Sequence, residues 1–198
     1  MAIIIKDPFL CTFIHIPKTG GTSISTWLNE NFSTQTSKGK KHCNVDVAKE
    51  LFENLGLTYC VVRNPWDLVV SWYHFKGQRA IRRKELILSN KKTFKGKWTL
   101  EYIENEIKLY ELGFENFVYT NDLTQQIVYA DQCDYILKFE SLNEDFKFIQ
   151  QKLNCSKPLP FMNQSIRNKN YQSYYSDKTK EIIQKQFQDD IYKFEYKF

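Results

Sequence analysis

The alternation of apolar and polar positions divides the chain into short apolar runs and longer stretches with helical spacing. Three runs of strand length, rich in β-branched and aromatic residues, occupy 12–16, 57–62 and 135–139. Apolar residues three and four positions apart predict helices around 24–28 and over 45–55, 65–77, 99–112, 142–153 and 177–194. The pattern is ambiguous over 114–130, where we expect a helical turn around Leu123, Ile127 and Val128.

Local signals place several boundaries of these elements. Thr22 or Ser23 is the expected N-cap of the first helix, and Asn44 that of the second. Gly56 and Gly77 are expected to end the second and third helices. The polar stretches 29–44 and 155–176 are expected to be loops. Strands alternating with helices predict an α/β fold, a short parallel sheet with helices on both faces. No repeat or linker interrupts the chain, which predicts a single domain over 1–198.

The turn after the first predicted strand has the features of an anion-binding site. Its residues, Lys18 to Ser23, contain two adjacent glycines that allow a close approach of the backbone to a ligand. A helix begins there, so backbone amides and the helix dipole favour a negative charge. Lys18 and the hydroxyls add further donors. The order of residues is not the Walker pattern, in which the glycines precede a lysine.

A second corner carries an arginine and a serine with a suitable spacing. Arg63 follows the strand 57–62, at the carboxyl end where α/β sheets bind ligands. Ser71 lies eight residues further along, two turns into the helix that starts at Pro65. A guanidinium and a hydroxyl can hold a phosphate from two sides.

The strings HIPKTGGTS and VVRNPWDLVVSWYHF together resemble the two nucleotide-binding motifs of the sulfotransferases that use 3′-phosphoadenosine-5′-phosphosulfate (PAPS), most closely the carbohydrate-type branch. The resemblance covers most of the chain, although only these motifs are specific. It implies a P-loop-like three-layer fold and sulfuryl transfer from PAPS to a hydroxyl, with adenosine 3′,5′-bisphosphate as the product. It also implies that Lys18 stabilises charge at the transfer centre, that Arg63 and Ser71 bind the 3′-phosphate, and that the 5′-phosphate is bound by Thr19, Gly20, Gly21, Thr22 and Ser23.

Two further site residues follow from the resemblance. His42 stands before the predicted helix 45–55, where a histidine of this branch is expected to act as the general base, and an imidazole suits that role near neutral pH. A surface histidine is an equal alternative, and Glu50 and Glu53 are weaker candidates for the base. Arg167 lies in the loop that often closes over the nucleotide in this family, so it is expected to contact a phosphate.

Composition sets limits on the ligands and the compartment. The net charge of +5 suits an anionic ligand without singling out nucleic acid. The basic run 76–97 is expected to be a solvated face, with an anionic glycan as the alternative. Five cysteines without metal-binding spacing indicate reduced thiols, no metal and a reducing, cytoplasmic location. No apolar run has the length of a signal peptide or membrane span, so no membrane partner is expected.

The acceptor is expected to be a glycan or another hydroxyl compound. Three alternative functions remain open at this stage. A P-loop-like kinase or NTPase would require magnesium at the Lys18 turn. A non-catalytic module would bind a nucleotide or an anionic glycan without turnover. A nucleic-acid binder would use the basic run 76–97 and show steep salt dependence.

Overall fold

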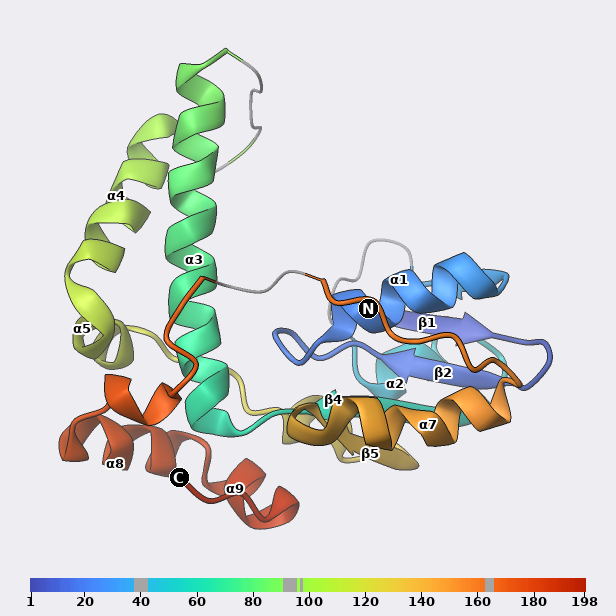
Figure 1. Ribbon diagram of the computed structural model, residues 1–198. Helices are drawn as coiled ribbons and strands as arrows, with labels where there is room; N and C mark the ends of the chain where they lie inside the picture. Colours follow the sequence, from blue (N-terminus) through green and yellow to red (C-terminus); the bar gives the residue numbers. More distant parts are fainter. Residues whose placement is uncertain (38–42, 91–95, 97, 163–165) are drawn as a thin grey trace. The chain divides into compact units, whose positions relative to one another are not determined.

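The computed structural model describes residues 1–37, 43–90, 96, 98–162 and 166–198, which form two compact units (Figure 1). The first, here called the sheet unit, comprises Met1–Asn64, Thr124–Gln164 and Asp189–Lys197. The second, the helical unit, comprises Pro65–Leu123, Ser165–Gln188 and Phe198. The single domain 1–198, in which the two units would fold only together, stays a prediction.

A mixed five-stranded sheet lies at the centre of the sheet unit. Its strands are β1 (Ala2–Ile5), β2 (Cys11–Ile14), β3 (Thr34–Thr36), β4 (Leu57–Val62) and β5 (Tyr135–Lys138), in the order β3-β1-β2-β4-β5. β2, β4 and β5 are parallel, whereas β1 is antiparallel to both β2 and β3. The α/β prediction is therefore confirmed, and the all-parallel sheet is wrong for β1 and β3.

The two antiparallel pairings have simple causes. Only residues 6–10 separate β1 from β2, which is too short for the crossover that parallel strands require. β3 lies within the stretch expected to be a loop, because its sequence, Thr-Gln-Thr, has no apolar residue. β3 lies at the edge of the sheet and pairs only with β1, so it does not need an apolar, buried face.

Helices cover both faces of the sheet. On one face, α1 (Gly21–Asn31) and α7 (Leu142–Lys152) pack their apolar side chains against β1, β2, β4 and β5. On the other face lie α2 (Val45–Lys49), α6 (Ile127–Ala130) and α9 (Gln188–Phe194). β4 shows the alternation directly, because Tyr59 and Val61 enter the first core and Cys60 and Val62 the second. The expectation of three layers is confirmed for this unit.

The helical unit is built on one long helix, α3 (Pro65–Leu88), with α4 (Leu100–Glu111) running beside it (Figure 1). α5 (Gly113–Thr120), the 3₁₀ turn η2 (Tyr171–Tyr174) and α8 (Asp177–Gln186) complete the unit. The predicted end of α3 at Gly77 is wrong. A Cβ at Gly77 would overlap the ring of Tyr110, so this glycine lets α4 approach closely rather than ending the helix.

Other boundaries also differ from the expectations. The N-cap of α1 is Gly20, with φ of 83°, and not Thr22 or Ser23. Asn44 does cap α2, but that helix ends at Lys49 rather than near Gly56. The predicted helix 177–194 is two helices, α8 and α9, separated at Phe187. Over 114–130 the structure has α5 and α6, with Leu123 outside both.

Within the described ranges, no helix combines the length and the apolarity needed to cross a bilayer.

Candidate functional site

The turn predicted to bind an anion connects β2 to α1 at the carboxyl end of the parallel strands. Lys18 and Gly20 both adopt left-handed backbone conformations, with φ of 68° and 83°. Thr19, between them, is fully buried, and its hydroxyl donates to the Ile16 carbonyl at 2.9 Å. The Thr19 side chain therefore fixes the turn from inside, and its backbone amide is the part that suits a phosphate.

The start of α1 is shaped for close approach. Gly20 provides no side-chain cap, and a Cβ at Gly21 would overlap the imidazole of His15. The first amides of a helix have no acceptor inside the helix, so they are natural anion donors. Here the Ser23 N–H already donates to the Gly20 carbonyl at 3.0 Å, so the amides of Gly21 and Thr22 are the ones that suit an anion. Thr22 is exposed, and Ser23 accepts a hydrogen bond at its Oγ from the Met162 amide at 3.3 Å. The hydroxyls of Thr22 and Ser23 thus lie in the outer part of the turn.

Arg63 joins the second motif to this turn. It follows β4 directly, and its Nη1 donates to the Lys18 carbonyl at 2.9 Å. Its guanidinium carbon also lies 4.0 Å from the centre of the Phe139 ring, a cation–π distance. Arg63 is only 6% exposed. Two residues that are 45 positions apart in the sequence thus meet at one edge of the sheet, as expected.

A side-chain amide holds the backbone of Arg63 in place. Gln126 accepts from the Arg63 N–H and donates to the Arg63 carbonyl, both at 2.8 Å. It thereby reproduces the pairing of a neighbouring strand at the point where β4 ends. Gln126 is 1% exposed.

Gln126 is itself anchored on a buried carboxylate. Asp190, fully buried, accepts at Oδ2 from the Gln126 amide N–H at 2.8 Å and from Gln126 Nε2 at 3.2 Å. Its Oδ1 accepts from the Ile127 N–H at 2.7 Å. Burial raises the pKa of Asp190, whereas these three N–H donors act in the opposite direction. Neither Gln126 nor Asp190 belongs to a motif, so this pair was not predicted from the sequence.

The strand-to-helix junction after β5 closes the same edge. Glu140 accepts from the Asn64 amide at 2.7 Å through Oε1 and from the Tyr196 hydroxyl at 3.1 Å through Oε2. Asn64 also donates from Nδ2 to the Lys197 carbonyl at 2.8 Å. The pKa of Tyr196 is raised, mainly by burial and to a smaller extent by the neighbouring charge of Glu140. These bonds give the junction a structural role at the edge of the sheet.

Ser71 and Arg167 lie in the helical unit. Arg167 Nη2 bonds Asp67 Oδ1 at 2.6 Å, with both side chains largely buried. Asp67 and Ser71 are one helical turn apart on α3, so they share a face of that helix. The Nη1 atom of Arg167 is buried and has no partner among the described residues. A buried guanidinium nitrogen without a described partner, paired to the helix face that carries a buried serine, suits a phosphate oxygen.

One turn further along α3, His74 lies between two tyrosines. Its Nδ1 is 3.0 Å from the Tyr110 hydroxyl and its Nε2 is 3.0 Å from the Tyr174 hydroxyl. Burial, and then the positive charge of Arg167, lower the pKa of His74. His74 was not among the predicted site residues, although it lies only three residues after Ser71 in the sequence.

The remaining predicted residues receive less support. His42 lies outside the described residues. Glu50 and Glu53 are exposed on the surface around the end of α2. All five cysteines are free thiols. The described residues contain no group of three or more histidine, cysteine or acidic side chains that could hold a metal.

The basic run 76–97 has partners within the helical unit. Lys84 forms an ion pair with Glu104 at 2.9 Å. The guanidinium carbon of Arg83 lies 3.5 Å from the centre of a Trp98 ring, and that of Arg79 lies 4.8 Å from it. These contacts join α3 to the start of α4, which favours the reading of the run as a structural, partly solvated face.

Comparison with protein-family models, with curated proteins and with solved structures finds no match for this chain.

We predict that Gln126→Met strongly destabilises the protein. The change removes both bonds to the Arg63 backbone and one donor to Asp190 and leaves buried polar groups unpaired, at a cost of about 2–4 kcal/mol. Urea unfolding measures the free energy of unfolding. The control Gln184→Met, at an exposed position of α8, should change it by no more than about 0.5 kcal/mol. Equal stability of the two variants would contradict the role given to Gln126.

We predict that His74 makes the stability depend on pH. Because the folded-state pKa is lowered below 6.5, the unfolded chain takes up the proton first. The contribution is complete above pH 6.5 and is lost as the pH falls toward the lowered folded-state pKa. His74→Gln keeps a donor and an acceptor but does not titrate, so its unfolding free energy should fall less over this window. Parallel curves for wild type and variant in urea titrations would rule out this contribution.

Proposed function

We propose that this chain is a PAPS-dependent sulfotransferase that transfers a sulfuryl group to a hydroxyl acceptor, preferentially a carbohydrate. The observation that carries the proposal is the hydrogen bond from Arg63 Nη1 to the Lys18 carbonyl. It brings Arg63, the arginine of the second motif, to the Lys18 turn of the first at the carboxyl edge of β2 and β4. A P-loop-like fold is part of this proposal.

The residues of the Lys18 turn have defined tasks in such a transfer. The backbone amides of Thr19, Gly20, Gly21 and Thr22, together with the outer hydroxyls of Thr22 and Ser23, would hold the 5′-phosphate. The ammonium of Lys18 would neutralise the charge that develops on the bridging and sulfuryl oxygens. Arg63 supplies a second positive charge behind the turn, and its bond to the Lys18 carbonyl fixes the backbone from which the lysine side chain extends.

The reaction itself is an in-line displacement. The acceptor oxygen attacks sulfur, the bond between sulfur and the bridging oxygen breaks, and that oxygen stays on the 5′-phosphate. A general base takes the acceptor proton, a role we assign to His42, with a carboxylate as the alternative. Positioning and charge stabilisation supply most of the rate, as in phosphoryl transfer. No step requires a metal.

The 3′-phosphate contacts are assigned to Arg63, to Ser71 and, in addition, to Arg167. The supporting observation in the helical unit is the buried Nη1 of Arg167, which has no described partner although Nη2 is paired with Asp67. A charged phosphate oxygen is the kind of acceptor that such a donor needs. A kinase or NTPase would instead place a magnesium-bound terminal phosphate at Lys18, and the order of glycines in this turn does not favour it.

We expect calorimetry to show binding of adenosine 3′,5′-bisphosphate without added metal, and weaker binding of AMP, which lacks the 3′-phosphate. Arg63→Ala should weaken binding of the bisphosphate by about tenfold or more, because it removes a charge-assisted contact. Arg82→Ala, at an exposed position of α3, is the control and should bind normally. Equal affinity for AMP and the bisphosphate would remove the basis for the 3′-phosphate assignment.

We expect transfer of label from radiolabelled PAPS to a panel of hydroxyl acceptors, glycans included. Lys18→Ala should reduce turnover by about two orders of magnitude or more, because it removes the charge at the transfer centre. Lys147→Ala, an exposed residue of α7, should leave turnover unchanged. His42→Ala should also be severely impaired, and full activity in that variant would move the base role to a carboxylate. Bisphosphate binding without turnover on any acceptor would favour a non-catalytic module.

A further inference from the structure

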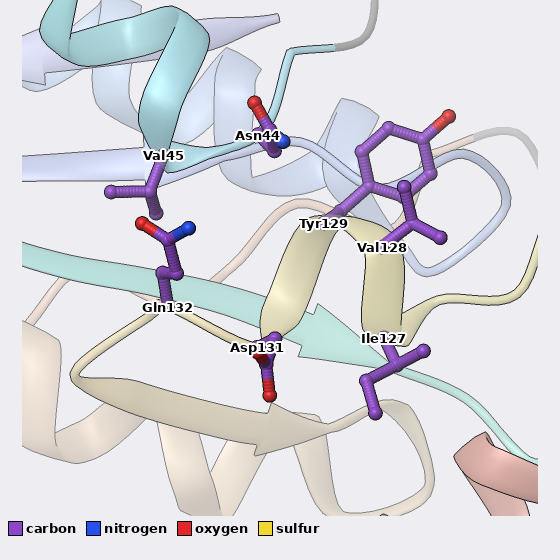
Figure 2. A pocket seen from close by; sticks show the side chains of 7 residues that line it. All are labelled: Asn44, Val45, Ile127, Val128, Tyr129, Asp131 and Gln132. Carbon is purple, nitrogen blue, oxygen red and sulfur yellow. The ribbon is translucent and has the colours of Figure 1, made fainter.

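A pocket of about 330 Å³ lies in the sheet unit, between the start of α2 and α6 (Figure 2). It has the volume of a small-molecule site. α2 and its cap contribute Asn44 and Val45, and α6 with the turn after it contributes the rest of the lining: Ile127, Val128, Tyr129, Asp131 and Gln132. None of these residues belongs to the motifs discussed above.

Two amide side chains in the lining are held in fixed orientations. Asn44 accepts from the Val47 amide through Oδ1 at 3.1 Å, so its NH₂ group is the part left to face a ligand. Gln132 donates from Nε2 to Asp46 Oδ2 at 2.7 Å, so its carbonyl oxygen is left as an acceptor. One preset donor and one preset acceptor match a hydroxyl group, which both accepts and donates. Because the amides are already ordered, binding loses little side-chain entropy.

The charge of the lining selects against anions. Asp131 provides a carboxylate, and none of the described lining residues is a lysine, arginine or histidine. Outside the lining, Lys193 Nζ lies 3.7 Å from Asp131 Oδ1 in an exposed ion pair. A phosphate or sulfate would therefore face a carboxylate, with no positively charged side chain among the described lining residues to offset the repulsion. A neutral hydroxyl group, in contrast, can donate to that carboxylate.

The rest of the lining is apolar or amphipathic. Val45 is buried, Ile127 is partly buried, and Val128 is 54% exposed at the rim. Tyr129 adds a ring and a hydroxyl, and burial raises its pKa, so the hydroxyl stays protonated at neutral pH. Apolar contacts together with a few fixed polar groups are the usual composition of a ligand site. The C–H faces and hydroxyl edges of a sugar ring match both kinds of surface.

We propose that this pocket binds a neutral polyhydroxylated ligand, a sugar of one or two rings. The proposal does not rest on nucleotide binding or on sulfuryl transfer, because none of its lining residues takes part in either. The sugar proposal would remain valid if the chain bound no PAPS. If the sugar proposal were refuted, the assignments of Lys18 and Arg63 would be unaffected.

The test is a titration of the nucleotide-free, full-length chain with maltose and with methyl β-glucoside, followed by NMR of the methyl groups. We expect saturable shifts that concentrate on Val45, Ile127 and Val128. Glucuronate, the anionic counterpart of the glucoside, should bind more weakly. The absence of saturable shifts with both neutral probes, or shifts that lie elsewhere, would overturn the proposal, as would tighter binding of glucuronate.

Matched variants locate the polar contacts. Asp131→Asn keeps the shape but removes the charged acceptor, so maltose affinity should fall by about tenfold. Gln132→Ala, at an exposed position, should weaken binding by several-fold. Glu144→Gln is the control, an exposed acid-to-amide change on α7 that should leave the affinity unchanged. Wild-type affinity in both pocket variants would mean that the sugar binds elsewhere, and it would refute the assignment.

Discussion

The candidate site depends on how Arg63 is held at the end of β4. The side chain and the main chain of this residue are fixed by separate partners: Lys18 accepts from the guanidinium, and Gln126 pairs with the backbone. Arg63 therefore has little freedom to move without breaking buried bonds. The left-handed conformation of Lys18, which is uncommon for a residue with a side chain, is held by the same contact from outside and by Thr19 from inside.

The polar groups behind Arg63 form a unit rather than a set of separate bonds. Gln126 and Asp190 are almost completely buried, and their described hydrogen bonds satisfy each other and the backbone around them. In a low-dielectric interior an unpaired polar group is destabilising. Removal of one member therefore leaves its partners unpaired and lowers the free energy of unfolding. This explains how a site made of loops can keep a fixed geometry. It also explains why α9, far along the sequence, is needed at the end of β4.

The sequence predicted the parts of this arrangement that depend on local patterns. The apolar run of β4, the glycine turn at Lys18 and the proline at the start of α3 are all short-range signals, and each was located correctly. Gln126 and Asp190 were missed because an isolated buried polar residue leaves no periodicity in the sequence. Gly77 was misread for a related reason: its role is set by the Tyr110 ring, which comes from another helix. The antiparallel β1 could have been inferred from the short connection to β2.

The short helix α6 links the Arg63 region to the proposed sugar pocket within the sheet unit. Gln126, which pairs with Arg63, is the N-cap of α6, and the next residue, Ile127, lines the pocket. The amides of both residues donate to Asp190, so one buried carboxylate positions both. The geometry of the Arg63 region and that of the pocket wall thus depend on the same few bonds, so the loss of the Asp190 carboxylate would disturb both together.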